Sequence, residues 1–175
     1  VVEVRPQPRQ IAAAREHGSV VYGVPGHPGV AERTVRLLRD AARRGDIELE
    51  VVPGLSFADL AWTRLAIDPL STGARLVDAR DFAVEPPDLT SPILVAQCDS
   101  PMVLSDVKLA LLELLDPTHE VVVLHHLGLP DEEVRTVALA DLDRFLPDHL
   151  TSVFVAAPGR VLPVEVARLW SLARR

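Results

Sequence analysis

The sequence of 175 residues contains only one cysteine, Cys98, one lysine, Lys108, and no asparagine. A single cysteine excludes an internal disulfide framework and is typical of proteins in a reducing cytoplasm. There is neither a signal-peptide pattern nor an apolar run long enough to cross a membrane, so secretion and membrane insertion are not expected. The net charge of −7 and the pI of about 5.3 give no overall support for binding nucleic acid. We therefore expect a cytoplasmic protein with no nucleic-acid and no membrane partner.

What the chain does have is apolar residues, 48% of the total, which is enough for one core or two small ones. In the first third, residues 47–52 are apolar at alternate positions and predict a strand. Pro53 and Gly54 end that strand, because proline cannot donate to a ladder and glycine adopts backbone angles closed to other residues. Ser56 can then cap a following helix.

The same order of elements occurs once before in the chain. Residues 19–23 predict a short strand, residues 24–29 a loop rich in proline and glycine, and residues 30–44 a helix. This repetition favours a parallel α/β sheet with both turns at its carboxyl edge. Helices that start at such an edge expose unpaired backbone N–H groups, and α/β folds bind ligands there.

Further strands and helices are expected in the rest of the chain. Residues 133–137 alternate at period two and predict a half-exposed antiparallel strand, while Ser100 and Pro101 form a favourable start for a helix at 101–115. The remaining expected elements are strands at 74–78, 92–98, 120–127 and 150–157 and a helix at 164–174. We expect an α/β protein with two small α/β domains, at residues 1–70 and 74–160, and a linker helix at 161–175.

Two residue types invite a catalytic interpretation. Ser56 lies in Gly-Leu-Ser-Phe-Ala, close to the G-x-S-x-G nucleophile elbow of hydrolases, but a helix cap or a ligand contact explains it more simply. His125 and His126 are adjacent on an expected strand, so their side chains should point to opposite faces and should not chelate one ion. Cys98 has no partner at zinc-ligand spacing, and no metal site is expected.

His27 and the acidic residues 131–133 are two further candidates for ligand binding. His27 lies in a glycine-containing loop, where its imidazole either touches a ligand or is a polar surface group. The acidic stretch lacks the E-E-x-x-E spacing with which a pyrophosphohydrolase holds magnesium. The phosphate-binding G-x-x-x-x-G-K-[ST] pattern is also absent.

Several motifs together resemble a known family. They are residues 20–28 followed by Ala-Glu-Arg at 31–33, then 51–56, 93–98, 125–133 and 150–155. In order and spacing these segments resemble the tetrapyrrole methylases, and more closely the methylase-like domain fused to MazG-type nucleoside triphosphate pyrophosphohydrolases. Residues 166–175 are similar to the lead-in helix of the pyrophosphohydrolase half.

The resemblance implies two α/β domains of the class III methyltransferase type, with S-adenosylmethionine (SAM) in the cleft between them. It implies methyl transfer to a tetrapyrrole-like or related small molecule, a reaction helped mainly by orientation and desolvation rather than by a conspicuous acid–base pair. No catalytic residue is assigned. The implied cofactor-binding residues are Pro25, Gly26, His27, Pro28, Pro53, Gly54, Leu55, Ser56, Ala96, Gln97, Cys98 and Thr151.

Two departures from the family pattern accompany the match. The Gly-rich G-x-G-x-G loop that opens the family has no counterpart before Ile11, and His27 replaces the usual aspartate. The first domain is therefore expected either to be truncated at its N-terminus or to have lost the cofactor site. Its unpaired sheet edge is expected to pair with a second copy in a homodimer, or the chain to be rearranged at its start. The leading hypothesis is a SAM-dependent methyltransferase. The alternatives are a non-catalytic dimerisation or ligand-sensing domain of a MazG-type enzyme, and a serine hydrolase.

Overall fold

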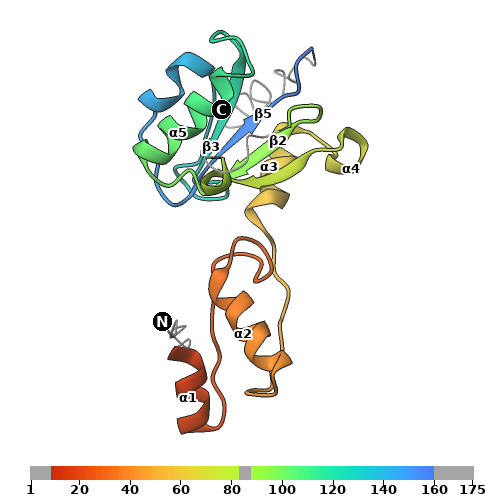
Figure 1. Cartoon of the computed structure of the whole chain (residues 1–175), viewed down its shortest axis with the longest axis vertical. Coiled ribbons are helices and arrows are strands. Elements are labelled where there is room, and N and C mark those ends of the chain that lie inside the picture. The colour runs from red at the N-terminus through yellow and green to blue at the C-terminus, as the bar shows by residue number, and fades with distance from the viewer. Residues whose placement is uncertain (1–8, 83–87, 160–175) are drawn as a thin grey trace, which may run out of the picture. The chain divides into compact units, whose positions relative to one another are not determined.

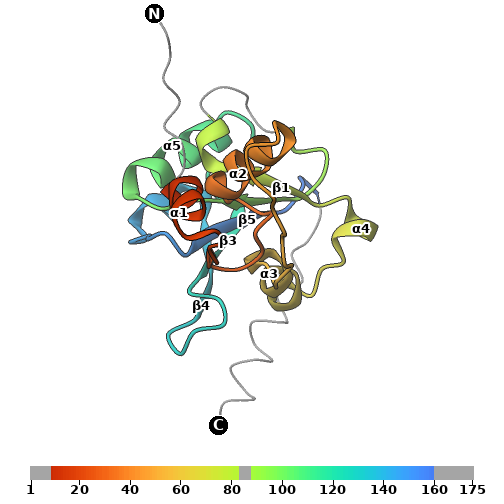
Figure 2. The same cartoon turned by 90° about the horizontal axis from the view of Figure 1, so that it is seen from below.

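The computed structural model describes residues 9–82 and 88–159. The chain divides into two compact units, Val1–Ser56 and Phe57–Arg175. Figures 1 and 2 together label the α-helices and strands of both.

The first unit is built from two helices and two extended segments. Helix α1 (Arg9–His17) and helix α2 (Arg33–Arg43) pack together through a small core of Ile11, Leu38 and Ala41. Helix α2 begins where the Glu32 carboxylate accepts a hydrogen bond from the Thr34 N–H at 2.9 Å, as N-cap residues do. It buries Val35, Leu38 and Ala41.

The strands predicted at 19–23 and 47–52 are not formed. Both segments belong to the described part of the chain, and neither is paired as a strand. An extended segment becomes a strand only when a neighbour accepts and donates its backbone hydrogen bonds, and none lies alongside these two within the described residues. The expected parallel sheet of the first unit is therefore wrong for this part of the chain.

The second unit contains one mixed sheet of five strands in the order β1-β2-β5-β3-β4. The strands are β1 (Arg75–Asp78), β2 (Ile93–Ala96), β3 (Glu120–His125), β4 (Glu133–Ala138) and β5 (Thr151–Val155). β1 and β2 are parallel, whereas β5 is antiparallel to both β2 and β3, and β4 is antiparallel to β3. All five strands were expected from the sequence, including the antiparallel direction of residues 133–137, and the α/β class is confirmed.

Helices cover both faces of this sheet, as Figure 2 shows for α5 and α3. Helix α5 (Pro101–Leu112) packs with the short helices η1 (Ala79–Asp81) and η2 (Leu139–Arg144) against one face. Helix α3 (Phe57–Leu65) packs on the other face through Ala58, Ala61 and Leu65. Every residue of β2 and β5 is buried, because both strands are covered from two sides.

The division of the chain falls between Ser56 and Phe57 because α3 packs on the sheet of the second unit. Between α3 and β1 lies the short helix α4 (Pro69–Thr72), which ends at Gly73 in a left-handed conformation. The domain ranges 1–70 and 74–160 stay predictions. The helix expected at 164–174 lies outside the described residues.

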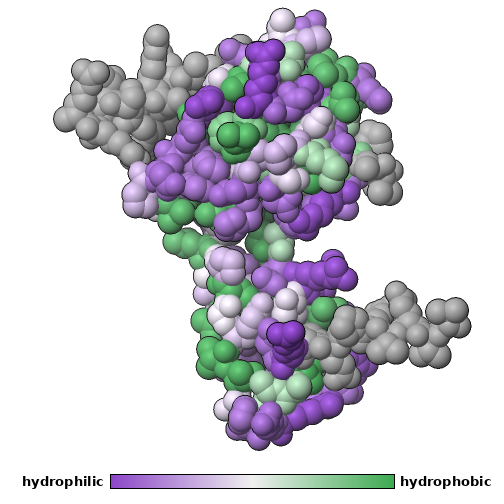
Figure 3. Space-filling view, turned by 90° about the vertical axis from the view of Figure 1, so that its left-hand side faces the viewer, coloured by the Kyte–Doolittle hydropathy of each residue, from purple (hydrophilic) through white to green (hydrophobic). Residues whose placement is uncertain are grey.

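The surface of the second unit is mainly hydrophilic on the face that Figure 3 shows. Among the described residues, no helix combines the length and the apolar character needed to cross a bilayer.

Candidate functional site

The first Pro-Gly turn, at residues 24–29, is fixed by its own polar groups. The Nδ1 atom of His27 accepts a hydrogen bond from the Gly29 N–H at 2.9 Å, and the His27 carbonyl accepts one from the Val30 N–H at 3.0 Å. An aspartate commonly makes the same bond to the N–H two residues on. His27 therefore performs the turn-closing role of the aspartate that it replaces, and the following Pro28 is buried.

The two Pro-Gly turns of the first unit are in direct backbone contact. A Cβ atom added to Gly54 would lie 3.1 Å from the carbonyl oxygen of Gly26, and one added to Gly26 would lie 3.3 Å from the carbonyl oxygen of Leu55. Gly26 has a φ of +75°, which glycine adopts without strain. The prediction that these two turns lie side by side is confirmed, and their glycines keep side chains out of the contact.

The residues after the second turn differ in exposure. Leu55 is 75% exposed, whereas Ser56 is only 7% exposed. A nucleophile elbow presents its serine at the surface of the molecule, so this burial does not favour the hydrolase interpretation.

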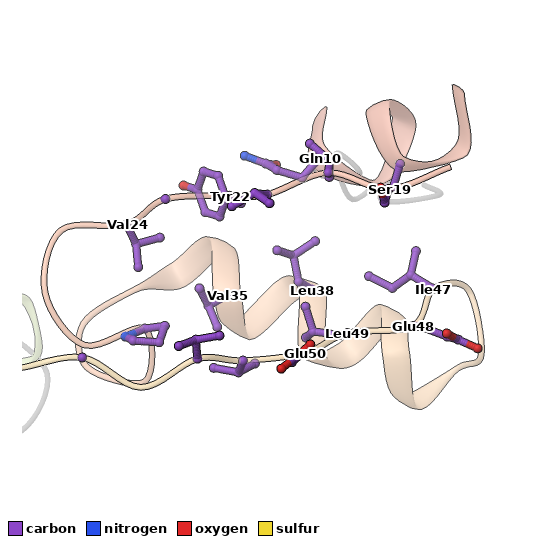
Figure 4. A pocket seen from close by; sticks show the side chains of 18 of the residues that line it. Gln10, Ser19, Tyr22, Val24, Val35, Leu38, Ile47, Glu48, Leu49 and Glu50 are labelled. Atoms are coloured by element: carbon purple, nitrogen blue, oxygen red, sulfur yellow. The ribbon is translucent and has the colours of Figure 1, made fainter. Parts of the chain in front are cut away.

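The first unit also contains a groove of about 1060 Å³ that sequence reasoning missed. It is bordered by α1, α2 and the extended segments 18–24 and 46–54. Figure 4 shows Val35 and Leu38 reaching into it from α2. Val21 and Val52, which belong to the two segments, are 97% and 72% exposed.

In the second unit, the expected cofactor residues gather at one edge of the sheet. β5 is antiparallel to both β2 and β3, so the carboxyl ends of β2 and β3 lie at the same edge as the start of β5. Gln97 directly follows β2 and His126 directly follows β3, and both have left-handed backbone, with φ of +61° and +52°. Left-handed conformations are uncommon for these residue types and are concentrated at functional sites.

Gln97 is held by two neighbouring side chains. Its amide nitrogen donates to the Asp78 carboxylate at 3.0 Å, and its amide oxygen accepts from the Arg80 guanidinium at 2.5 Å. Arg80 also pairs with Asp99 at 2.5 Å. This network fixes the backbone at the end of β2. No pattern in the sequence indicates that Asp78, Arg80 and Asp99 join Gln97 in one network, because they converge only when β1 pairs with β2.

Cys98 and Thr151 meet at the same edge of the sheet. The Cys98 N–H donates to the Thr151 carbonyl at 3.3 Å, and Ala96 and Cys98 are both buried. Burial, with a further effect of Asp99 and Asp78, raises the pKa of the Cys98 thiol to about 12. The thiol is therefore protonated at neutral pH and is not a nucleophile.

His125 and His126 correct one prediction from the sequence. Their rings do not point to opposite faces, but stack with centroids 3.7 Å apart and planes at 19°. The reason is the φ of +52° at His126, which takes the backbone out of the strand geometry on which that prediction rested. The exclusion of joint metal binding by this pair therefore no longer holds.

Carboxylates surround the stacked pair. Asp148 lies 2.8 Å from Nε2 of His126 and 3.7 Å from Nδ1 of His125, and Asp131 lies 2.5 Å from Nδ1 of His126. Thr151 Oγ1 is 2.9 Å from Nδ1 of His125. The hydrogen bonds with Asp148 and then Asp131 raise the pKa of His126.

The structure thus brings the expected cofactor residues together in two groups. Pro25, Gly26, His27, Pro28, Pro53, Gly54, Leu55 and Ser56 belong to the first unit, and Ala96, Gln97, Cys98 and Thr151 belong to the second.

The chain is similar to several known proteins. The family Tetrapyrrole (Corrin/Porphyrin) Methylases matches residues 4–143. The curated protein YabN of Bacillus subtilis (strain 168), described as uncharacterized, is 41% identical over 145 residues. These make up 82% of this chain and 29% of YabN, so the chain spans under a third of that relative.

Two crystal structures from Thermus thermophilus are similar to the chain. Uroporphyrin-III-C-methyltransferase is 27% identical, with a TM-score of 0.67, covering 94% of this chain and 72% of that one. The same kind of enzyme complexed with S-adenosyl homocysteine is 19% identical, with a TM-score of 0.62, covering 93% and 73% of the two chains. At that lower identity the likeness shows the fold alone.

Proposed function

Because the chain belongs to the tetrapyrrole (corrin/porphyrin) methylase family, we propose that it is a methyltransferase domain that binds SAM. The acceptor is proposed to be a tetrapyrrole-like or related small molecule. Support for this acceptor comes from the family and from the name of the uroporphyrin methyltransferase, which is 27% identical.

One observation carries the proposal: the backbone contact between the two Pro-Gly turns. Gly26 and Gly54 leave no room for a Cβ atom where the turns meet, so backbone groups rather than side chains form this surface. Methyl transfer from a sulfonium needs a tightly positioned cofactor more than it needs a strong acid or base. Rigid turns with exposed backbone suit that requirement.

The chain's own residues would bind and orient the cofactor. When bound, SAM supplies an electrophilic methyl group on a positively charged sulfur. The turns at 25–28 and 53–56 would offer backbone donors and acceptors, and Gln97 would do so at the end of β2. Cys98 and Thr151, whose backbone groups bond to each other, would shape the sheet edge. Cys98 would act through its backbone and its packing, since its thiol stays protonated.

Isothermal titration calorimetry with SAM and with S-adenosylhomocysteine tests the proposal. We expect one binding site per chain with a dissociation constant in the micromolar range, and no comparable binding of methionine alone. Absence of binding to both compounds would contradict the proposal and would favour the alternative below.

The alternative is a non-catalytic dimerisation or ligand-sensing domain within a longer protein of the MazG pyrophosphohydrolase type. A place within a longer protein is supported by the relative YabN, of which this chain spans 29%, whereas the MazG type rests on the sequence resemblance alone. The exposed extended segments around Val21 and Val52 support pairing with a second copy. Light scattering on the purified chain tests this: a dimer that binds no SAM supports the alternative, and a monomer that binds SAM contradicts it.

A further inference from the structure

We propose that His125, His126 and Asp148 form a binding site for a divalent transition-metal ion of the zinc class. One ligand atom of each residue lies within 4.8 Å of those of the other two. The carboxylate of Asp148 is 2.8 Å from Nε2 of His126 and 3.7 Å from Nδ1 of His125. Ligand atoms around a tetrahedral zinc ion with bonds of about 2.0–2.2 Å are roughly 3.3–3.6 Å apart, so the Asp148 carboxylate already lies near the required distance from both rings.

The left-handed backbone at His126 makes this convergence possible. Two successive residues of a regular strand face opposite sides, but here both rings lie on one side and Asp148 reaches across them. Because the lone pair of an imidazole nitrogen lies in the ring plane, an ion shared by both rings requires them to turn out of their stacked arrangement. Metal binding is therefore expected to change the environment of both rings.

A second ring of contacts is already in place. Asp131 lies 2.5 Å from Nδ1 of His126, which leaves Nε2 of that ring to face the ion. Such a carboxylate behind a metal-binding histidine fixes the tautomer and the ring orientation. Thr151 Oγ1 lies 2.9 Å from the same Nδ1 of His125, so an ion at that nitrogen would replace this hydrogen bond. The edge of the Phe145 ring packs against the His125 ring, with centroids 5.2 Å apart.

Burial and ligand type indicate the class of ion. The side chains of His125 and His126 are 15% and 18% exposed, and that of Asp148 is 39% exposed, so the site is shielded but can be reached. Two imidazoles and one carboxylate suit zinc, cobalt, nickel or copper, whereas magnesium and calcium prefer oxygen ligands alone. Three protein ligands leave a fourth tetrahedral position open to water or another molecule.

The same contacts also fit a protonated His126 with no metal ion bound. A His126 imidazolium could bridge Asp131 and Asp148 with no metal ion, as an ion-paired clasp between the β3–β4 turn and the loop before β5. The experiment must separate these two cases.

Chelator-treated protein is titrated with zinc by calorimetry and with cobalt by visible absorption. We expect one ion per chain at micromolar affinity or better, and an intense cobalt band typical of tetrahedral coordination. His126→Asn keeps a residue that tolerates left-handed backbone, so the variant should fold while losing the ligand. We expect it and Asp148→Asn to lower the affinity at least about 10-fold, and Asp131→Asn to lower it by roughly 10–100-fold.

His149→Gln is the matched control, because His149 is exposed and adjacent to Asp148 but is not one of the three proposed ligands. Its zinc affinity should equal that of the unmodified chain. Binding no tighter than about 1 mM, or affinities unchanged in His126→Asn and Asp148→Asn, would overturn the proposal and leave the histidine clasp alone. SAM binding is measured separately and does not affect this outcome.

Discussion

Gly54 is the residue at which a single added carbon should affect the proposed site most. Its Cβ would lie 3.1 Å from the Gly26 carbonyl oxygen, a backbone atom that cannot rotate away as a side chain would. Gly23 provides a natural comparison, because a Cβ there meets nothing within 4 Å. Neither glycine has a φ in the left-handed region, so the two differ in available space and not in backbone strain.

We expect Gly54→Ala to separate the two turns and to weaken SAM binding about 10-fold or more, with a loss of stability of about 1–3 kcal/mol from overpacking. Gly23→Ala should change neither quantity appreciably. Calorimetry with SAM and chemical denaturation measure the two effects. Equal SAM affinities in the two variants would show that the turn contact does not shape the cofactor site.

Cys98 gives a second test at the residue scale. Burial raises the pKa of its thiol to about 12, and the side chain is inaccessible in the folded chain. The native protein should therefore react very slowly with a thiol reagent such as dithionitrobenzoate at pH 8. The unfolded chain should release one equivalent of thionitrobenzoate at once. Rapid labelling of the native protein would contradict the burial of β2's carboxyl end.

Some residues of the site could be predicted from the sequence and others could not. Pro25, Gly26, Pro53 and Gly54 are recognisable because their chemistry restricts them to turns. The left-handed backbone at His126 is not recognisable, since histidine usually occupies ordinary conformations and the strain depends on distant contacts. The prediction that the two adjacent histidines diverge was wrong for that reason.

At the scale of elements, the contrast between the two units is informative. Segments 47–52 and 120–125 are both rich in β-branched residues, yet only the second is a strand. β3 has β4 and β5 on its two sides, whereas the extended segments of the first unit have no strand partner within the described chain. Apolar patterning indicates that a segment can pair, but the partner decides whether it does.

The contact between α5 and η2 gives a pH-dependent prediction. Lys108, the only lysine, lies 2.5 Å from the Asp143 carboxylate and lowers the pKa of Asp143 mainly through this hydrogen bond. A carboxyl whose pKa is lowered on folding adds stability above its unfolded pKa of about 3.9, and this is lost as the pH falls through the lower folded value.

Lys108→Gln should therefore destabilise the chain at pH 7 by about 1 kcal/mol or less, and the difference from the unmodified chain should disappear once the pH falls below the lowered pKa of Asp143. Arg43→Gln, which removes an exposed pair with Asp40 on α2, serves as the control and should cost little at any pH. Urea denaturation across this pH range measures both. A difference that persisted at the lowest pH would mean that Lys108 stabilises through packing rather than charge.

At the scale of the whole molecule, the class of fold was predictable but its strand order was not. Alternating strands and helices indicate an α/β protein, yet β5, the last strand in sequence, lies between β2 and β3. Placing it there depends on contacts between residues far apart in the chain, which local patterns do not encode. The same limit applies to the two groups of proposed SAM-binding residues, which only their family likeness links.

The most direct test of the account is a nuclear magnetic resonance titration of the labelled chain with S-adenosylhomocysteine. We expect one binding event to shift the backbone amides of Gly26 and Gly54 in the first unit and of Gln97, Cys98 and Thr151 in the second. If the amides of these residues did not shift at saturating ligand, the proposed SAM-binding residues would be wrong.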